Sequence, residues 1–470
     1  MIRTVYHAAE RSELANELAD AFLTSPWTAE MVAESGAGCL DRWPSWMEAL
    51  ALSVVAVHRT PPVDRRGELV GFIEAFLAEH PPSPSDSEPP HILRLLAEEG
   101  ASALGVSARR TLEHSWSIAE IESVAALAEK LELSDGQLAW LADVRGLERT
   151  VADEKLRNYR YRTLTRSGGL PRVIEAPKAR LKEIQRWVLR EILDHVPAHE
   201  AAHGFVRGRS VVSQSRLHTR QDAVLRLDLK DFFASIPAGR VYGIFRTLGY
   251  VPPVAHVLTG ISTNTIPQVV WREMPKTAES RLIQPQFWLG RQLATPHLPQ
   301  GAPTSPALAN LAAFRLDRRF AGLAAASGLR YSRYADDLTF SGPGRLRGRR
   351  DQFEELAASI ARQEGFALND GKSVLRSAGA RQLVCGVVVN VHPNVVRTEY
   401  DRLKAILHNA ARHGPASQNR SGIADFEAHL RGRIAWVSSL NPGRGEKLRG
   451  RFAEIDWGDD SAGAAGEPVS

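Results

Sequence analysis

Two adjacent carboxylates, Asp336 and Asp337, stand near the middle of the stretch YSRYADDLTF at residues 331–340. Apolar and aromatic residues on both sides predict a strand, a tight turn and a second strand, with the acids at the turn. Neighbouring carboxylates repel each other and are costly to desolvate unless a cation lies between them. A hard divalent cation meets that need, although an exposed acidic hairpin turn would show the same pattern.

A third acid comes from the stretch VLRLDLKDFFASIP at residues 224–237. Its apolar residues predict a buried strand that ends at Asp228 and is followed by Asp231, Phe232 and Phe233. Together with the acid pair, Asp228 could hold two Mg²⁺ ions about 3.5–4 Å apart, the arrangement that serves in-line attack on a phosphate. Such ions would activate a 3′-hydroxyl and stabilise charge on the transferring phosphoryl group.

Elements on either side of the acid pair contain further candidate groups. The stretch LPQGAPTSPALANLAAFRLD at 298–317 predicts a rigid turn and then a helix from Pro306 to Asp317, whose start suits a phosphate or a base. A helix is also expected from Asp351 to Gly365. Lys372 follows a glycine turn, where it could protonate pyrophosphate or simply be a solvated surface lysine.

Basic residues accumulate between residues 156 and 218. Arg166 and Arg172 flank the turn of a predicted hairpin, where their guanidinium groups could clamp a triphosphate, and a basic helix follows from Lys178. In AAHGFVRGRS, Gly204 and Gly208 relax the backbone around Arg207 and Arg209, in a loop suited to a sugar-phosphate strand.

Composition limits the class of protein. A length of 470 residues with 43% hydrophobic content predicts two or three compact domains. The sequence lacks a run of about eighteen apolar residues, and its start lacks the apolar stretch of a signal peptide. We therefore expect a cytoplasmic protein without a membrane partner. Cys39 and Cys385 are the only cysteines, which excludes a disulfide framework or a cysteine zinc site.

Charge is distributed unevenly along the chain. Residues 1–150 hold 12 Lys and Arg against 24 Asp and Glu, whereas residues 151–470 hold 47 against 30. The basic part is typical of a surface that binds a phosphate backbone, and nucleic acid is the expected partner. The acidic part has helical periodicity throughout, including a small helical hairpin at 123–144 around Ser134, and the run PPSPSDSEPP at 81–90 predicts a linker. Its charge predicts binding to protein, and the hairpin is either a packing unit or a helix-turn-helix.

The ordered motifs LDLKDFF, PQGAPTSP and YADD resemble the palm of a reverse transcriptase. HGFVRGRS, LPQGAPTSPALAN, RYADDLTFS and QLVCGVVVN are similar to blocks of the retron group of bacterial reverse transcriptases, and the resemblance extends from about Leu138 to Trp436. It implies a right-hand polymerase with fingers, an antiparallel palm sheet and a helical thumb, an α/β fold that here follows an all-α N-terminal domain. The expected domains are residues 1–135, fingers and palm at 136–394, a thumb at 395–452 and a disordered acidic tail at 453–470.

The resemblance also implies roles for individual residues. Asp228, Asp336 and Asp337 would be catalytic and would bind two Mg²⁺ ions, or Mn²⁺ in their place, with the carbonyl of Leu229, and Lys372 would protonate pyrophosphate. Phe233 would exclude a 2′-hydroxyl. Nucleotide binding would involve Arg166, Arg172, Asp231, Phe232, Phe233, Gln300 and Gly301. RNA or primer contacts would come from His203, Arg207, Arg209, His218, Val384, Cys385, Gly386, Arg431, Arg433 and Trp436.

Two blocks depart from the retron pattern. The NAxxH block has only its His218, and the VTG block is Val384-Cys385-Gly386. Both changes bear on how a structured RNA is handled and primed, while the polymerase core is intact. The thumb is expected to contain helices at 398–412 and 423–437, with Trp436 either in contact with RNA or in the core, and residues 262–297 are expected to be an insertion.

The sequence thus predicts an RNA-directed DNA polymerase of retron type that copies a structured non-coding RNA into complementary DNA from deoxynucleoside triphosphates. The resemblance places it in a bacterial antiphage defence system, with an effector protein bound through the N-terminal domain. Three alternatives stay open at this stage: untemplated synthesis, protein-primed synthesis, and a catalytically idle RNA-binding partner.

Overall fold

The computed structural model describes residues 8–25, 27–40, 44, 46–58, 61–62, 65–79, 116–151, 153–164, 170–277 and 279–457. The chain divides into two compact units, Met1–Ala198 with Asp231–Phe314, and His199–Lys230 with Arg315–Ser470. The predicted linker at 81–90, the turn at 167–169, Arg166 and most of the predicted tail lie outside the described residues. The predicted domain boundaries after residues 135, 394 and 452 stay predictions.

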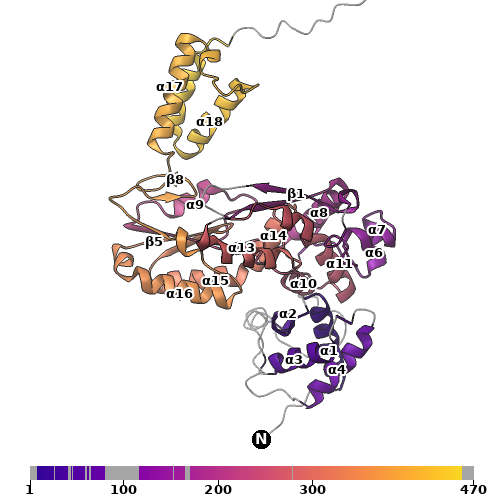
Figure 1. The fold of residues 1–470 in the computed structure, drawn as a ribbon. Helices are drawn as coiled ribbons and strands as arrows, with labels where there is room; N and C mark the ends of the chain where they lie inside the picture. Colours follow the sequence, from indigo (N-terminus) through magenta and orange to yellow (C-terminus); the bar gives the residue numbers. More distant parts are fainter. Residues whose placement is uncertain are drawn as a thin grey trace, which may run out of the picture. The chain divides into compact units, whose positions relative to one another are not determined.

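The described residues of the first unit form helices and one hairpin (Figure 1). Its first four helices bury one apolar cluster that includes Phe22, Met47 and Leu50. The capping box of Ser134 and Gln137 starts α7, as the sequence predicts. Its helices are α1 (Ala8–Leu23), α2 (Ala29–Leu40), α3 (Met47–Val57), α4 (Arg66–Glu79), α6 (Val124–Lys130), α7 (Asp135–Leu141), η3 (Glu154–Leu156), α8 (Ala179–Glu191), η4 (Leu193–His195), α10 (Ala238–Thr247), α11 (Pro252–Ser262), α12 (Gln268–Glu273), α13 (Ser280–Leu293) and α14 (Ser305–Ala312).

The hairpin of the first unit pairs β1 (Tyr159–Leu164) with β2 (Arg172–Pro177) in antiparallel register. Its second strand bonds to the loop before α14, because the Glu175 N–H donates to the Gln300 carbonyl at 2.9 Å. The helix predicted for 306–317 is interrupted at Ala313. Helix α14 ends at Ala312, and a new helix begins at Phe314.

The second unit contains a four-stranded antiparallel sheet of order β4-β5-β3-β6. Its strands are β3 (Ala223–Asp228), β4 (Arg330–Tyr334), β5 (Asp337–Gly342) and β6 (Val374–Ser377), and a small hairpin pairs β7 (Leu383–Val384) with β8 (Val387–Val388). The helices are α9 (Val211–Leu217), α15 (Phe314–Ala326), η5 (Gly344–Arg349), α16 (Arg350–Gln363), η6 (Asp370–Lys372), α17 (Arg397–His413), η7 (Pro415–Ser417), α18 (Phe426–Leu440) and α19 (Pro442–Ala453).

Helices α15 and α16 cover one face of this sheet (Figure 1). The rings of Phe320 from α15 and Phe353 from α16 meet Phe340 of β5 edge to face, with centroids 5.6 and 5.0 Å apart. Because side chains alternate along a strand, the residues of β5 on either side of Phe340 point to the opposite face. That face carries Asp337.

The last three helices pack on one another around an apolar cluster that includes Leu407, Leu430 and Leu448. α17 confirms the helix predicted at 398–412. α18 begins three residues later than predicted, because the Asp425 side chain accepts a hydrogen bond from the Ala428 N–H and caps the helix there. Within the described part of the chain, every helix is too short or too polar to cross a lipid bilayer.

Candidate active site

Asp228 and Asp337 lie directly opposite each other on neighbouring strands. β3 pairs with β5 in antiparallel register, and the last paired residues are Asp228 and Asp337. Directly paired residues of two antiparallel strands have Cβ atoms about 4.5–5.5 Å apart on one face of the sheet. The expected meeting of the strand acid with the acid pair is therefore confirmed, whereas the catalytic role of these residues stays a prediction.

Asp336 is in the two-residue turn that joins β4 to β5. Tyr334 pairs with Asp337, which leaves Ala335 and Asp336 as the turn, and Ala335 has the left-handed φ of 54°. The Asp336 carbonyl accepts a 2.9 Å hydrogen bond from the N–H of Leu229, so the turn is tied to the end of β3. All three acids are thus held together where β3 ends and β5 begins.

The backbone at residue 204 lies so close to this turn that only a glycine fits there. A Cβ built on Gly204 would lie 2.7 Å from the backbone nitrogen of Ala335, a separation that side chains do not tolerate. The glycine that the sequence suggested as a flexible loop position therefore allows backbone contact with the turn.

A buried ion pair supports the same turn. Arg333 and Asp317 have fully buried side chains and form two hydrogen bonds of 2.7 and 2.6 Å. Arg333 Nη1 also donates to the Ala335 carbonyl at 3.1 Å, and the Tyr331 hydroxyl donates to Asp317. Sequence reasoning missed this pair, since Arg333 looked like one polar residue of a strand.

Two cations engage the strand acids. Lys372 Nζ donates to both carboxylate oxygens of Asp228, at 2.9 and 2.8 Å, and Asn369 adds a third contact at 3.3 Å. Arg226 Nη2 lies 3.1 Å from Asp337 Oδ1. Lys372, predicted as a proton donor, is thus at the acidic site, with about half of its side chain exposed.

The carboxyl group of Asp336 is partly buried beside two other acids. Burial raises the pKa of its carboxyl group, and the negative charges of Asp228 and Asp337 raise it further. The Cys385 thiol contacts Asp337 Oδ2 at 3.8 Å, and burial together with that charge raises its pKa to about 12. A thiol with so high a pKa stays protonated, so Cys385 is neither a nucleophile nor a thiolate ligand here.

The donor set fits a divalent cation. Carboxylates and backbone carbonyls are the ligands that hard ions take, and a cation would relieve the repulsion that raises the pKa of Asp336. Across the described residues, no group of three His, Cys, Asp or Glu side chains is arranged to hold a metal as it stands. Lys372 and Arg226 pair with Asp228 and Asp337 in this arrangement.

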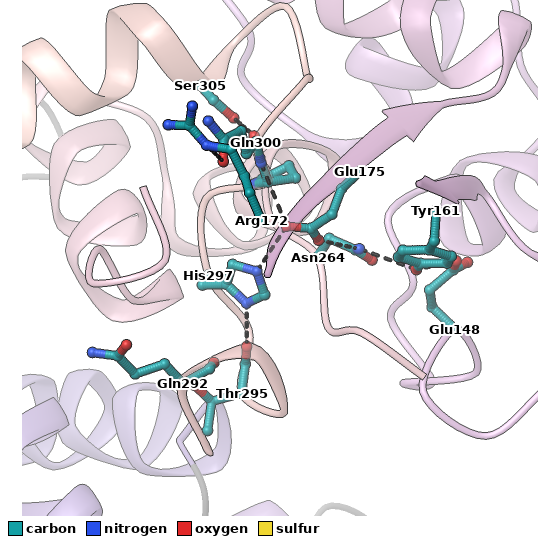
Figure 2. A network of polar contacts seen from close by, with 11 residues as sticks. Glu148, Tyr161, Arg172, Glu175, Asn264, Gln292, Thr295, His297, Gln300 and Ser305 are labelled. Carbon is teal, nitrogen blue, oxygen red and sulfur yellow. Dashed lines mark hydrogen bonds and ion pairs between the residues drawn. The ribbon is translucent and has the colours of Figure 1, made fainter. Parts of the chain in front are cut away.

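Arg172 and Gln300, expected to bind the nucleotide, contact each other in the first unit. Arg172 Nε donates to Gln300 Oε1 at 2.9 Å (Figure 2). Gly301 has φ of 134°, and a Cβ there would lie 2.8 Å from the Glu175 carbonyl, so the loop is pressed against β2. Gln300 and Gly301 are therefore both held by contacts with β2, the strand that carries Arg172.

A buried polar network beneath this loop was not anticipated from the sequence. Glu175 is 1% exposed and accepts hydrogen bonds from Asn264 Nδ2 at 2.7 Å, His297 Nε2 at 3.1 Å and the Gln300 N–H at 3.4 Å (Figure 2). Burial alone would lower the pKa of His297, but Glu175 and the Thr295 carbonyl raise it above its ordinary value. Residues 262–297, predicted as an insertion, therefore contribute to the support of Gln300.

The predicted aromatic gate residues differ in exposure. Phe232 is 4% exposed, whereas Phe233 is only partly buried, and their ring centroids are 5.6 Å apart. Asp231, beside them, has a left-handed φ of 48°. Phe233 is therefore the more accessible of the two, and the roles of both rings in nucleotide binding stay predictions.

One expected RNA contact is corrected. The side chain of His218 is fully buried and bonded to Ser341 at 2.6 Å and Ser332 at 2.7 Å, so it braces the sheet and does not face RNA. His203 is also buried and bonds to Ser213. Burial lowers the pKa of His218 to about 3 and of His203 to about 4.

Four of the other expected RNA or primer contacts lie in turns and loops of the second unit. Arg209 Nη1 donates to three backbone carbonyls and so organises the loop, while Arg207 is exposed. Cys385 and Gly386 form the β7–β8 turn, both with positive φ, after the buried Val384. Their contacts with nucleic acid stay predictions.

The expected RNA contacts on α18 differ in their partners. Arg431 is paired with Glu427, whereas Arg433 lines a cavity, and Trp436 is 42% exposed. The exposure of Trp436 excludes the alternative in which this side chain is part of the core.

Comparisons with known proteins agree with this geometry. The chain matches the family model for reverse transcriptase (RNA-dependent DNA polymerase) over residues 165–389. It is 41% identical to the retron Mx65 reverse transcriptase of Myxococcus xanthus over 63% of this chain and 65% of that one, slightly less than two thirds of the relative's length. It is 33% identical to the retron Mx162 reverse transcriptase of the same organism over 76% of this chain and 72% of that one.

One further relative and one solved structure are more distantly similar to the chain. The retron Ec86 reverse transcriptase of Escherichia coli is 30% identical over 60% of this chain and 78% of that one. A foamy viral protease-reverse transcriptase solved with double-stranded DNA matches 66% of this chain and 41% of that one at 15% identity, with a TM-score of 0.33, which is too low to add to the assignment. With two relatives at 30% identity or more and over two thirds of their length matched, the chain belongs to the retron reverse transcriptases, a family of RNA-directed DNA polymerases.

Proposed function

We propose that this chain copies a structured non-coding RNA into DNA by two-metal nucleotidyl transfer. The observation that carries the proposal is the direct pairing of Asp228 with Asp337, beside the turn that holds Asp336. The three carboxylates come from two distant parts of the chain, and their mutual repulsion is unfavourable even though Lys372 and Arg226 pair with two of them. Phosphoryl transfer gives that arrangement a use.

A reverse transcriptase domain implies a divalent metal cofactor. We assign two Mg²⁺ ions, with Mn²⁺ as a substitute, to Asp228, Asp336, Asp337 and the Leu229 carbonyl. When bound, they would supply an activated 3′-hydroxyl and charge stabilisation at the phosphoryl group. The carboxylates hold and orient this set, and the two strands fix their positions.

Lys372 is proposed as the proton donor to pyrophosphate. Its ammonium group is held at Asp228 by bonds of 2.9 and 2.8 Å, and its partial exposure leaves it accessible to an incoming anion. Binding of a triphosphate would draw the ammonium toward the phosphates, because its present partner would then be shared with metal ions. Lys372 would there release a proton at Nζ.

The nucleotide-binding set is proposed to comprise Arg166, Arg172, Asp231, Phe232, Phe233, Gln300 and Gly301. Arg172 and Gln300 are held together at 2.9 Å, which presents a guanidinium and an amide as one preformed unit. The partly exposed Phe233 is the proposed barrier to a 2′-hydroxyl. An amide and a guanidinium would orient base and triphosphate.

Partners beyond the nucleotides are proposed from the family and from charge. The template is a structured non-coding RNA and the product its complementary DNA, within an antiphage defence system in the bacterial cytoplasm. The acidic residues 1–150, with 24 Asp and Glu against 12 Lys and Arg, suit an effector protein better than nucleic acid.

Purified protein with primed RNA and labelled deoxynucleotides tests the proposal. Incorporation is expected only with template, divalent metal and the deoxynucleotides complementary to the template. Incorporation without template would favour untemplated or protein-primed synthesis. A folded protein that binds RNA without incorporating nucleotide would favour a catalytically idle partner.

A further inference from the structure

The backbone of residues 367–369 lies against the end of β3. Leu368 forms an antiparallel bridge with Leu229. The N–H of Asn369 donates to the Asp228 carbonyl at 2.8 Å. Because paired antiparallel strands run in opposite directions, the residue after Leu368 is opposite the residue before Leu229. Asn369 is therefore the direct neighbour of Asp228 on the side of β3 away from Asp337.

The side chain of Asn369 contacts the carboxylate of Asp228. Its Nδ2 donates to Asp228 Oδ2 at 3.3 Å. Asn369 directly precedes the short helix η6, a position from which an asparagine side chain usually accepts a hydrogen bond from the helix and so caps it. Within the described residues, this side chain makes no such capping bond. Its amide is therefore directed to the carboxylate and does not stabilise the helix that follows.

Lys372 is placed by the same asparagine. The N–H of Lys372 donates to the Asn369 carbonyl at 2.9 Å, and its Nζ donates to both carboxylate oxygens of Asp228. Directly after it, the hydroxyl of Ser373 donates to Glu354 of α16 at 2.6 Å. The backbone here is thus bonded to β3 on one side and to α16 on the other. Movement of the Lys372 side chain would therefore leave Asn369 in place.

The two donors to Asp228 differ in charge. The ammonium group of Lys372 is positive, so it competes with a metal ion for the carboxylate. The amide of Asn369 is neutral, and a carboxylate has about four lone-pair positions, so it can accept this bond and still bind cations. The side chain of Asp228 is only 11% exposed, which leaves water little room to replace a lost donor. Hydrogen bonds of this kind orient metal ligands and raise metal affinity.

We propose that Asn369 is a positioning residue for nucleotidyl transfer. It holds the Asp228 carboxylate in the orientation of a metal ligand after the ammonium group of Lys372 has turned to the triphosphate. The inference rests on the proposed function for the reaction itself. It adds a residue that acts through Asp228 and makes no contact with the nucleotide.

Single-nucleotide incorporation on primed RNA tests this role in the full-length chain. Asn369→Ala should lower the rate at saturating deoxynucleotide about ten- to a hundredfold, the range expected for one hydrogen bond to a charged group. The deoxynucleotide concentration at half-maximal rate should change less than about twofold, because in this role Asn369 does not contact the nucleotide. Asn369→Asp keeps the size of the side chain and can begin a helix equally well, but it cannot donate and it repels Asp228. Its rate should fall at least as far.

Asn441→Ala is the matched control, because Asn441 also precedes a helix but does cap it. Its side chain accepts a hydrogen bond from the Arg444 N–H at 3.1 Å. Loss of that cap should lower the melting temperature by roughly 2–4 °C and leave the rate near the parental value. Asn369→Ala should do the opposite. A second measurement does not depend on turnover: with template, a dideoxy-terminated primer and the next deoxynucleotide, Asn369→Ala should weaken Mn²⁺ binding, followed by electron paramagnetic resonance, at least about tenfold.

Three outcomes would overturn the inference. The first is a parental rate in either Asn369 variant, or parental Mn²⁺ affinity in the folded Asn369→Ala protein. The second is a fall in melting temperature in Asn369→Ala as large as that of Asn441→Ala, which would make the role structural. The third is an unchanged maximal rate with a raised half-maximal deoxynucleotide concentration, which would assign Asn369 to the nucleotide. A parent protein that incorporates nothing would instead refute the proposed function, and the Mn²⁺ measurement would still decide the role of Asn369.

Discussion

Replacing Asp317 with Asn should destabilise the protein strongly, because it leaves a buried charge without its partner. Arg333 and Asp317 are both fully buried and share hydrogen bonds of 2.7 and 2.6 Å. Removing one partner of such a pair costs about 3–5 kcal/mol. For a unit of this size, each kcal/mol lowers the melting temperature by roughly 2–4 °C, so a fall of about 6–20 °C is expected.

A compensated variant separates stability from activity at the same site. Asp317→Leu, Tyr331→Phe and Arg333→Met together replace the buried charges and the hydroxyl that bonds to Asp317 with apolar side chains, and leave the Ala335 carbonyl without its Arg333 donor. Well-packed apolar replacements of buried ion pairs are often close to neutral in stability. The triple variant should therefore recover most of the melting temperature. It should not recover activity, because the Ala335 carbonyl has lost its donor and the Asp336 turn is no longer held.

Thermal melting by circular dichroism and primer extension measure the two quantities. Arg397→Ala is the control, because its exposed pair with Asp401 should contribute at most about 1 kcal/mol. An Asp317→Asn protein whose free energy of unfolding lies within about 1 kcal/mol of the parent value would refute the reasoning about the buried charge. A triple variant with full activity would refute the link between Arg333 and the turn.

Three further predictions concern other contacts of the two units. Glu175→Gln removes the buried charge beneath Gln300, so the KM for deoxynucleotides should rise about tenfold with a smaller change in kcat, which steady-state kinetics would detect. His218 titrates at about 3 in the folded state, so the unfolded chain binds more protons below about pH 6.5; stability should fall on acidification toward pH 3, and His218→Gln should flatten that dependence in urea titrations. Gly204→Ala should displace the turn at Ala335, which should lower the melting temperature and reduce single-turnover incorporation by the folded protein, and parental incorporation would contradict the contact.

The sequence was sufficient to predict where the three acids lie, but it was insufficient to predict the buried contacts that surround them. The alternation in residues 224–228 and 331–340 predicts two strands with acids at their ends, and their pairing is confirmed. The partner of Arg333 was not predictable, because Asp317 is on a helix sixteen residues away and nothing local indicates that both are buried. A buried charge in a strand flanked by aromatic residues is the one signal that could have pointed to the pair.

The same reasoning explains the correction at His218. The RNA contact at His218 was implied by the NAxxH block of the retron pattern, but the hydroxyls of Ser332 and Ser341 that bind this histidine are on two strands whose register is invisible from the sequence alone. Glu175 and His297 were missed for a related reason, since they are 122 positions apart and meet only because β2 pairs with the loop before α14. Long-range polar contacts depend on topology, which local patterns do not determine.

Single-turnover incorporation of one deoxynucleotide on primed RNA tests the central claim most directly, with Asp228→Asn at the end of β3 compared against Asp222→Asn just before its start. Asp222 is exposed at the other end of β3, where it accepts a hydrogen bond from the Gly344 N–H. The account predicts a loss of at least about a thousandfold for Asp228→Asn, which removes a metal ligand, and a near-parental rate for Asp222→Asn. A folded Asp228→Asn protein that incorporates nucleotide at the rate of the Asp222→Asn control would contradict it.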